Sequence, residues 1–327
     1  MNKTALITGF TGQDGYYLSQ LLLRQGYKVI GLLPPGRQDS LVKLDELAEQ
    51  IVVYSVDLRD AAALQTAVDQ LQPTEIYNLA APSFVPNSWQ DPLGTLDLVT
   101  GTATRLLAAI RNTGLATRFY QASSSEIFGA VQESPQSVDT PFRPKNPYGA
   151  AKLHAHWTMT HHREHYGLFA CSGILYNHES PRRPPQFVTR KVTLAAAAIK
   201  LGLKDRLSMG NLDAKRDWGF AGDYVEAMWR MLQADSPKDY VIGTGILHSV
   251  RDLVQLAFDS VDLDWQKYVE VSTELLRRDE HFQLVADPSA AQQDLQWTPQ
   301  VKFEQLIEQM VMADLKRLES GQVVLSR

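Results

Sequence analysis

The sequence Gly9-Phe10-Thr11-Gly12-Gln13-Asp14-Gly15 lies between an apolar run at residues 3–8 and a segment of helical character at residues 16–23. The apolar run is typical of a buried parallel strand, so this part of the chain is expected to form a strand, a glycine-rich turn and a helix. The spacing is G-x-x-G-x-x-G, whereas the common dinucleotide fingerprint is G-x-G-x-x-G. Both spacings bind a dinucleotide for the same physical reasons. Glycines let the backbone approach a pyrophosphate, and the helix N-terminus offers N–H groups to it. We therefore predict a dinucleotide site here, with a plain turn as the alternative.

The alternation of strand and helix continues along the chain. Runs typical of strands occur at residues 28–33, 51–56, 75–79, 117–122 and 168–175, and helical segments at residues 61–71 and 92–112. A further strand at residues 239–242 is expected to return to the same sheet. Such alternation predicts an α/β fold, a doubly wound parallel sheet of the Rossmann type with a smaller α/β substrate lobe.

Two domains are expected from this pattern. A dinucleotide-binding Rossmann domain would span residues 1–175, with returning segments around residues 211–245. The remainder, residues 176–327, would form mainly the substrate-binding lobe. The chain contains neither a linker nor an internal repeat.

Composition narrows the class of protein. The chain has 327 residues, of which 44% are hydrophobic and 21% charged, as in ordinary soluble globular proteins. Its net charge of −5 argues against a nucleic-acid-binding surface. The single cysteine, Cys171, rules out an intrachain disulfide and is expected to be buried. Neither a signal-peptide core nor an apolar run of membrane-spanning length is present, so a cytoplasmic protein without a membrane partner is expected.

The sequence Tyr148-Gly149-Ala150-Ala151-Lys152 carries a candidate general base. Positions four apart share one face of a helix, so Tyr148 and Lys152 would point the same way. A cation near a phenol favours the phenolate, and the phenol could then remove a proton from an alcohol near neutral pH. The spacing alone is common by chance, so its meaning depends on its neighbours.

Those neighbours are Ser123-Ser124-Ser125-Glu126, which follow the fifth predicted strand. Ligands of open parallel sheets bind at the carboxyl ends of the strands, where this motif is expected to lie. A polar turn is the alternative for the motif alone. The combination of a serine, a glutamate, a tyrosine and a lysine at one edge of the sheet indicates a catalytic site far more specifically than any one of these residues.

Three short features bear on the cofactor. No acidic residue follows the second strand, and Arg37 comes soon after it, which favours NADP over NAD. Asp57-Leu58 follows the third strand, where an adenine contact is common. Asn78-Leu79-Ala80-Ala81 ends the fourth strand with small residues that allow a flat cofactor to lie close.

Charged clusters in the second half were considered as ligand sites. His161 and His165 are four residues apart, but the H-E-x-x-H order is absent, so a solvated helix face is expected and no metal. Cationic clusters recur at residues 182–183, 190–191, 216 and 277–278. Arginine side chains match phosphate bidentately, so a phosphate-bearing ligand is a reasonable inference, with solvated surface charge as the alternative for each cluster.

Together these stretches resemble the GDP-mannose 4,6-dehydratase family of the extended short-chain dehydrogenase/reductase superfamily. The resemblance runs along nearly the whole chain and is most specific at residues 9–15, 77–81, 123–126, 148–152, 177–183, 187–191 and 216–219. It implies an NADP-dependent hydro-lyase of deoxysugar biosynthesis that converts GDP-mannose to GDP-4-keto-6-deoxy-mannose. The expected chemistry is oxidation at C4, elimination of water across C5 and C6, and hydride return to C6.

The resemblance also implies roles for individual residues. Ser124 would take the hydroxyl role that is often a threonine, Glu126 that of the acid and base, Tyr148 that of the C4 base, and Lys152 that of its partner. The residues implied to bind the cofactor are Gly9, Thr11, Gly12, Gln13, Asp14, Gly15, Arg37, Asp57, Leu58, Leu79, Ala80, Ala81, Ser83, Tyr148, Lys152, His178 and Arg183. Those implied to bind the GDP-sugar are Ser83, Ser124, Glu126, Asn177, Lys191, Arg216, Arg277 and Glu280.

The chain departs from the family pattern in three places. The basic Arg-Arg-Ser-Ser stretch that follows the second strand, which grips the NADP phosphate and supports tetramer contacts, is here Leu33-Pro34-Pro35-Gly36-Arg37. The glutamine expected after Asn-Leu-Ala-Ala is Pro82, and the aromatic residue expected near Gly94 is missing. A homodimer or a homotetramer is therefore expected.

Two other functions remain open at this stage. A related NDP-sugar 4-reductase or epimerase could use the same tyrosine and lysine, and a non-catalytic NADP-sensing regulator could keep the fold. Glu126 separates the dehydratase from the first group, because simple reductases and epimerases need no acid at this position.

Overall fold

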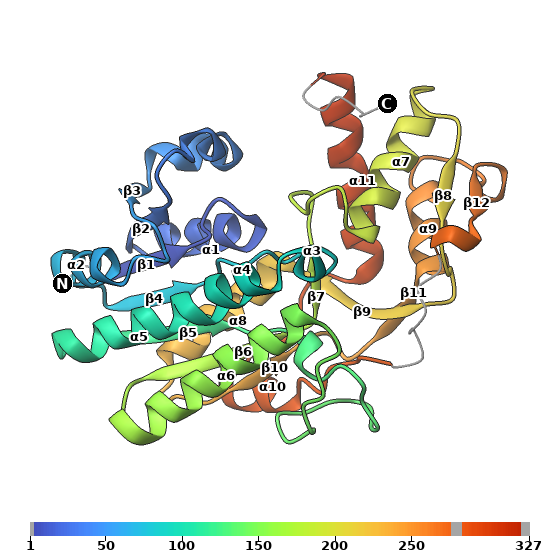
Figure 1. Cartoon of the computed structure of the whole chain (residues 1–327). Coiled ribbons are helices and arrows are strands. Elements are labelled where there is room, and N and C mark those ends of the chain that lie inside the picture. The colour runs from blue at the N-terminus through green and yellow to red at the C-terminus, as the bar shows by residue number, and fades with distance from the viewer. Residues whose placement is uncertain (1–2, 276–282, 322–327) are drawn as a thin grey trace.

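The computed structural model describes residues 3–275 and 283–321 (Figure 1). Its largest sheet has seven parallel strands in the order β10-β6-β5-β4-β1-β2-β3. The strands are β1 (Thr4–Thr8), β2 (Lys28–Leu33), β3 (Val52–Ser55), β4 (Glu75–Asn78), β5 (Arg118–Ala122), β6 (Ala170–Leu175) and β10 (Tyr240–Ile242). The predicted doubly wound parallel sheet is thus confirmed.

Helices cover both faces of this sheet. Apolar side chains of α1 (Gln13–Arg24), α8 (Ala221–Gln233) and α10 (Ser289–Leu295) pack into the core on one face. Those of α2 (Ala61–Leu71), α5 (Thr102–Thr113) and α6 (Pro147–Tyr166) form the core on the other. The strands are apolar on both sides because both sides are covered.

A smaller lobe stands beside the carboxyl ends of the strands (Figure 1). It contains a three-stranded sheet in the order β11-β9-β7 and a pair, β12-β8. Their bounds are β7 (Asn177–Glu179), β8 (Leu207–Met209), β9 (Lys215–Phe220), β11 (Leu247–Ser249) and β12 (Val269–Val271). Helices α7 (Val188–Lys200), α9 (Val250–Asp259) and α11 (Phe303–Glu319) enclose its own apolar core, in which Trp218 stacks on Phe303.

The remaining elements are short, apart from η1, which has 12 residues. They are η1 (Gln38–Glu49), α3 (Asn87–Gln90), α4 (Pro92–Leu96), η2 (Asp97–Gly101), η3 (Ser125–Ile127), η4 (Trp265–Lys267) and η5 (Thr273–Leu275). Within the described residues, no helix combines the length and apolarity needed to cross a membrane.

The predicted continuous helix at residues 92–112 is wrong in one respect. The π-helical turn η2 separates α4 from α5. Just after α4, Leu98 lines the cavity described below, and the Thr100 hydroxyl donates to the carbonyl oxygen of Ala151 at 2.9 Å. Single π turns are frequent near functional sites, and this one contributes Leu98 to the lining of the cavity.

Candidate active site

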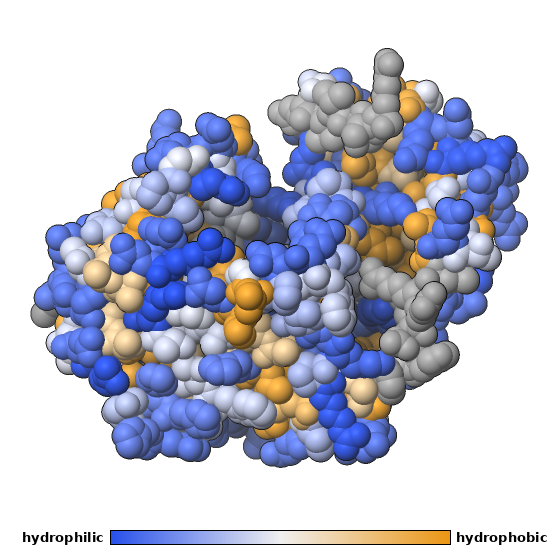
Figure 2. Space-filling view, in the orientation of Figure 1, coloured by the Kyte–Doolittle hydropathy of each residue, from blue (hydrophilic) through white to orange (hydrophobic). Residues whose placement is uncertain are grey.

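A cavity of about 450 Å³ lies at the carboxyl ends of the large sheet, next to the smaller lobe. Figure 2 shows the surface hollowed between the two lobes. The cavity is lined by the glycine-rich turn, by the segments that follow β2, β4 and β5, and by residues of α6 and β7. This is the place where open α/β sheets bind ligands.

The glycine-rich turn is shaped for close approach of backbone. Gly9 has a φ of +70°, and a Cβ there would lie 2.9 Å from the backbone nitrogen of Ala80. A Cβ on Gly15 would lie 2.5 Å from the carbonyl oxygen of Gly9. Helix α1 begins at Gln13, directly after Gly12, so its N-terminal N–H groups and positive dipole end lie at the cavity. The turn fits a pyrophosphate.

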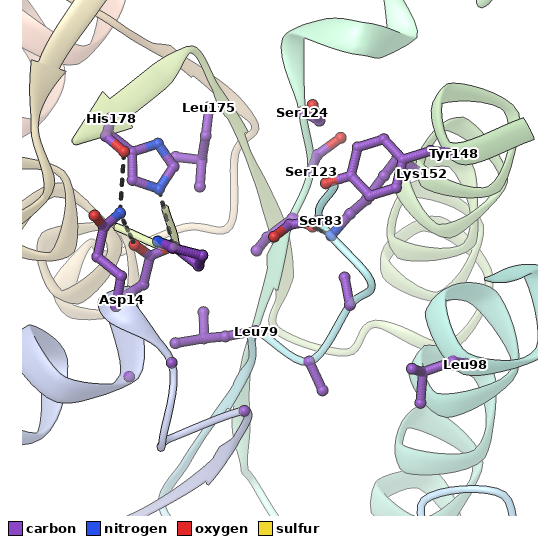
Figure 3. A pocket seen from close by; sticks show the side chains of 18 of the residues that line it. Asp14, Leu79, Ser83, Leu98, Ser123, Ser124, Tyr148, Lys152, Leu175 and His178 are labelled. Carbon is purple, nitrogen blue, oxygen red and sulfur yellow. Dashed lines mark hydrogen bonds and ion pairs between the residues drawn. The ribbon is translucent and has the colours of Figure 1, made fainter. Parts of the chain in front are cut away.

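Asp14 and His178 form an ion pair on one side of the cavity (Figure 3). His178 Nε2 lies 2.9 Å from Asp14 Oδ2, and His178 Nδ1 lies 2.7 Å from the carbonyl oxygen of Tyr176. A carbonyl oxygen and an ionised carboxylate both accept, so the protonated ring, which donates from both nitrogens, satisfies both partners. Burial lowers the pKa of His178, but Asp14 outweighs it and the pKa is raised. The pair ties α1 to β7 across the site.

Tyr148 and Lys152 lie on the opposite side, on one face of α6 (Figure 3). Lys152 Nζ lies 5.6 Å from the centre of the Tyr148 ring and donates to the carbonyl oxygen of Ala122 at 2.7 Å. Burial lowers the pKa of Lys152 to about 8. The expected shift of the phenol is not found in the protein alone, because burial and then the charge of Glu126 raise the pKa of Tyr148. A hydrogen bond with Ser124 and the charge of Arg183 oppose that rise.

Ser124 and Glu126 stand at the end of β5, facing Tyr148. The Ser124 hydroxyl accepts a hydrogen bond from the backbone N–H of Glu126 at 3.3 Å and caps η3. Glu126 lines this cavity and a second one of about 380 Å³. Its carboxylate therefore lies where the two cavities meet, which is where a reacting group of a ligand spanning both would be placed.

The second cavity is polar and carries cationic side chains. Asn177, Lys191 and Arg216 line it, together with Arg183. Lys191 Nζ donates to the carbonyl oxygen of Ser208 at 2.7 Å, and burial followed by the charge of Lys204 lowers its pKa. Arg183 lies 3.1 Å from Glu179 and stacks on the ring of Phe187. These groups suit an anionic ligand.

Comparison with known proteins decides the family. The profile of the family described as GDP-mannose 4,6 dehydratase matches residues 6–310. GDP-mannose 4,6 dehydratase 2 of Arabidopsis thaliana is 46% identical over 334 residues, which cover 98% of this chain and 89% of the relative. The chain belongs to the GDP-mannose 4,6-dehydratase family.

Solved structures show how widely the fold of this family is shared. RMD from Pseudomonas aeruginosa, complexed with NADPH, superposes with a TM-score of 0.82 at 22% identity, covering 97% of this chain and 100% of that one. The dTDP-glucose 4,6-dehydratase DesIV from Streptomyces venezuelae, solved with NAD bound, gives a TM-score of 0.84 at 22% identity, covering 98% of each chain. At this identity the likeness concerns the fold alone.

Most of the site residues predicted from the sequence line one of the two cavities. The first cavity includes all four assigned catalytic residues and every assigned cofactor residue except Arg37 and Asp57, which are exposed and do not line it. Asn177, Lys191 and Arg216 line the second cavity. Arg277 and Glu280 lie outside the described residues.

Two further residues of the site, Ser123 and Asn146, have no individual role among those predicted from the sequence. Ser123 is buried at the first cavity, and its hydroxyl has no hydrogen-bond partner among residues 3–275 and 283–321. An unpaired buried hydroxyl at a cavity fits a polar ligand there. Asn146 donates a hydrogen bond to Glu126. An asparagine followed by proline is typical of a helix start, but that pattern does not indicate what the side-chain amide contacts.

Proposed function

We propose that this chain converts GDP-mannose to GDP-4-keto-6-deoxy-mannose. Membership of the dehydratase family supports the reaction as a whole. The observation that carries the proposal is the position of Glu126, which shares one cavity with Tyr148 and Lys152 and also borders the second. Elimination of water needs a group there that can take the C5 proton and give one to the leaving hydroxyl, as a carboxylate can, whereas oxidation of an alcohol does not.

A nicotinamide dinucleotide is proposed for the first cavity. The glycine turn that a Cβ would fill, the helix N-terminus and the unpaired Ser123 hydroxyl support this fit. When bound, the cofactor would accept hydride from C4 of the sugar and return it to C6. Asp14 and His178 would hold one side of its site, and Leu79, Ala80 and Ala81 would provide a flat apolar wall.

The protein residues would divide the proton transfers between them. Tyr148 would remove the C4 hydroxyl proton, assisted by the Ser124 hydroxyl, which favours the phenolate. Lys152, with its lowered pKa, sits beside the phenol and is held by the carbonyl of Ala122. Glu126 would then remove the C5 proton, which the neighbouring 4-keto group makes acidic, and deliver a proton to the C6 hydroxyl, which departs as water. C5 would regain a proton that exchanges with solvent when hydride returns to C6.

The second cavity would hold the nucleotide of the substrate. Lys191 and Arg216 would meet the pyrophosphate, and Asn177 would lie between it and the cofactor. Arg277 and Glu280 are proposed to complete this site. We also propose that the protein acts in the cytoplasm and that it forms a homodimer or homotetramer. Exposed apolar side chains on the neighbouring helices α3, α4 and α6 support an interface between subunits; they are Trp89, Leu93 and Trp157.

The substrate test is incubation of the purified protein with a panel of nucleotide sugars, read by product mass. GDP-mannose is expected to lose one water, without net consumption of reduced cofactor. Dehydration of dTDP-glucose or CDP-glucose with GDP-mannose left intact would show that the proposed nucleotide is wrong. Net consumption of reduced cofactor would indicate a reductase, and a product that keeps its C6 oxygen would indicate an epimerase.

The cofactor preference depends on Arg37 in this proposal. NADP+ is expected to bind more tightly than NAD+ by about ten- to thirtyfold, because a single charge-assisted phosphate contact at an exposed site contributes roughly 1–2 kcal/mol. Arg37→Ala should remove that preference in titrations with each dinucleotide. Arg24→Ala, at the far end of α1, is the control and should keep it. Tighter native binding of NAD+ would contradict the proposal, and an unchanged preference in Arg37→Ala would exclude Arg37 as its source.

A further inference from the structure

Asn146 makes two hydrogen bonds with the two ends of one side-chain amide. It is the N-cap of α6, and its Oδ1 accepts from the backbone N–H of Gly149 at 2.7 Å. Its Nδ2 donates to Glu126 Oε2, also at 2.7 Å. The same amide therefore joins the helix that carries Tyr148 and Lys152 to the carboxylate on η3.

The orientation of this amide follows from its partners. A backbone N–H only donates, so the atom that receives it must be the amide oxygen. The amide nitrogen then necessarily points to Glu126, where an ionised carboxylate only accepts. Neither partner would be satisfied by the flipped amide, so the bond to Glu126 is fixed by the helix cap.

The first turn of α6 also packs closely against the backbone of Glu126. A Cβ on Gly149 would lie 2.6 Å from the carbonyl oxygen of Glu126, so only glycine allows α6 to pack this closely on η3. The Ser124 hydroxyl holds the backbone N–H of Glu126 from the other side. With its backbone fixed at two points and Oε2 bonded, the carboxylate has little freedom to turn.

We propose that Asn146 is a positioning residue for the elimination step, one that holds Glu126 by Oε2 so that Oε1 exchanges the proton with the sugar. The proposal rests on the acid–base role of Glu126 in the proposed function. A hydrogen bond donated to a carboxylate favours its ionised form, which is the form that takes the C5 proton. Once Oε1 is protonated, Oε2 still accepts from Asn146, so the carboxyl group need not rotate between taking the proton and giving it up.

Two substitutions separate this role from that of the helix cap. Asn146→Asp keeps the size and the capping oxygen but loses the donor and sets a second carboxylate beside Glu126. Asn146→Ser keeps a capping hydroxyl but is too short to reach Glu126. Serine, aspartate and asparagine cap helices about equally well, so α6 should be retained in both.

The elimination rate is expected to fall about ten- to a hundredfold in Asn146→Ser and further in Asn146→Asp, because a hydrogen bond to a charged group is lost. C4 oxidation, read as the absorbance of reduced nicotinamide, should stay within about threefold of the native rate. Without the donor, the ionised form of Glu126 loses a hydrogen bond that favours it. The acid limb of the pH–rate profile for elimination should therefore move to higher pH, further in Asn146→Asp, where the carboxylates repel.

Asp60→Ser is the matched control, because Asp60 caps α2 by the same type of bond, to the N–H of Ala63, and does not line the site. It should leave both rates and the profile unchanged. A native elimination rate and profile in Asn146→Ser and Asn146→Asp would show that Asn146 is a helix cap only. An equal fall in C4 oxidation and elimination would likewise overturn the proposal, because the effect would then lie on Tyr148.

A second readout does not depend on turnover. The carbon-13 resonance of the Glu126 carboxyl, assigned by its loss in Glu126→Gln, reports hydrogen bonding to the carboxylate directly. A shifted resonance in Asn146→Ser and Asn146→Asp is expected even if GDP-mannose is not the substrate. An unshifted resonance in both variants would overturn the proposal even if GDP-mannose is dehydrated, so the two failures are distinguishable.

Discussion

Glu126→Gln is expected to lower overall turnover by about a hundred- to ten-thousandfold while C4 oxidation continues. Glutamine keeps the size and the hydrogen bonding of the side chain but cannot take the C5 proton, and general acid–base catalysis contributes about this factor. The variant should accumulate a 4-keto sugar that still carries its C6 oxygen. Product mass and the absorbance of reduced nicotinamide measure the two half-reactions separately.

Tyr148→Phe provides the comparison, because it should block the first step and leave the cofactor oxidised. In heavy water the native protein should deliver product labelled at C5, since the proton returned there exchanges with solvent. Native dehydration by Glu126→Gln would contradict the assigned role of the carboxylate. Loss of C4 oxidation as complete as in Tyr148→Phe would show that the two half-reactions are not divided between these residues.

The large sheet was predictable because its signal is local. Buried parallel strands are short apolar runs, and the predicted runs end within two residues of β1 to β6. Helix α2 has the predicted bounds, residues 61–71. The glycine turn could be located because a Cβ at Gly9 or Gly15 would collide with neighbouring backbone. Where the path of the backbone allows only glycine, the glycine itself marks that position in the sequence.

What the sequence did not show depends on contacts between distant segments. The bond from Asn146 to Glu126 requires α6 to pack on η3, and the turn η2 is stabilised in part by Thr100 bonding to α6. The raised pKa of Tyr148 follows from burial, which residue spacing does not report. Arg182, expected near a phosphate-bearing ligand, instead stacks on Tyr16 and pairs with Asp45.

The ion pair of Arg190 with Asp314 is another contact of this kind, between α7 and α11. Arg190 Nε donates to Asp314 Oδ2 at 2.9 Å, and Arg190 Nη2 forms an ion pair with Asp314 Oδ1 at 2.6 Å. Both residues are buried. Arg190 also donates to the carbonyl oxygens of Pro181 at 2.7 Å and Arg183 at 3.0 Å, so it holds the segment that brings Arg183 into the site. Burial raises the pKa of Asp314 despite this partner. The cost of desolvating the Asp314 carboxylate thus exceeds its attraction to Arg190. Ionisation of Asp314 therefore lowers the free energy of unfolding as pH rises above the pKa that this carboxyl has in the unfolded chain.

Arg190→Met is therefore expected to lower the free energy of unfolding in urea by about 3–5 kcal/mol, because it leaves a buried carboxylate without its main partner. The value should lie at the lower end, since Arg317 remains 3.5 Å from Asp314. The double variant Arg190→Met/Asp314→Leu should recover most of the loss, because a buried ion pair replaced by apolar side chains is often neutral. Cofactor affinity should stay severalfold below native in the double variant, because the carbonyl oxygen of Arg183 loses the guanidinium of Arg190. The carbonyl oxygen of Pro181 keeps a second donor, Arg317, at 2.6 Å.

The exposed pair of Lys200 with Asp262, 4.0 Å apart, supplies the control for this prediction. Lys200→Met should cost less than about 1 kcal/mol, because solvent screens an exposed pair. A loss in Arg190→Met no larger than this would show that water or Arg317 compensates Asp314. A double variant as unstable as the single one would show that the loss of unfolding free energy comes from the broken hydrogen bonds to the carbonyls and not from the unpaired Asp314 carboxylate. Native cofactor affinity in the double variant would mean that the segment carrying Arg183 keeps its position without Arg190.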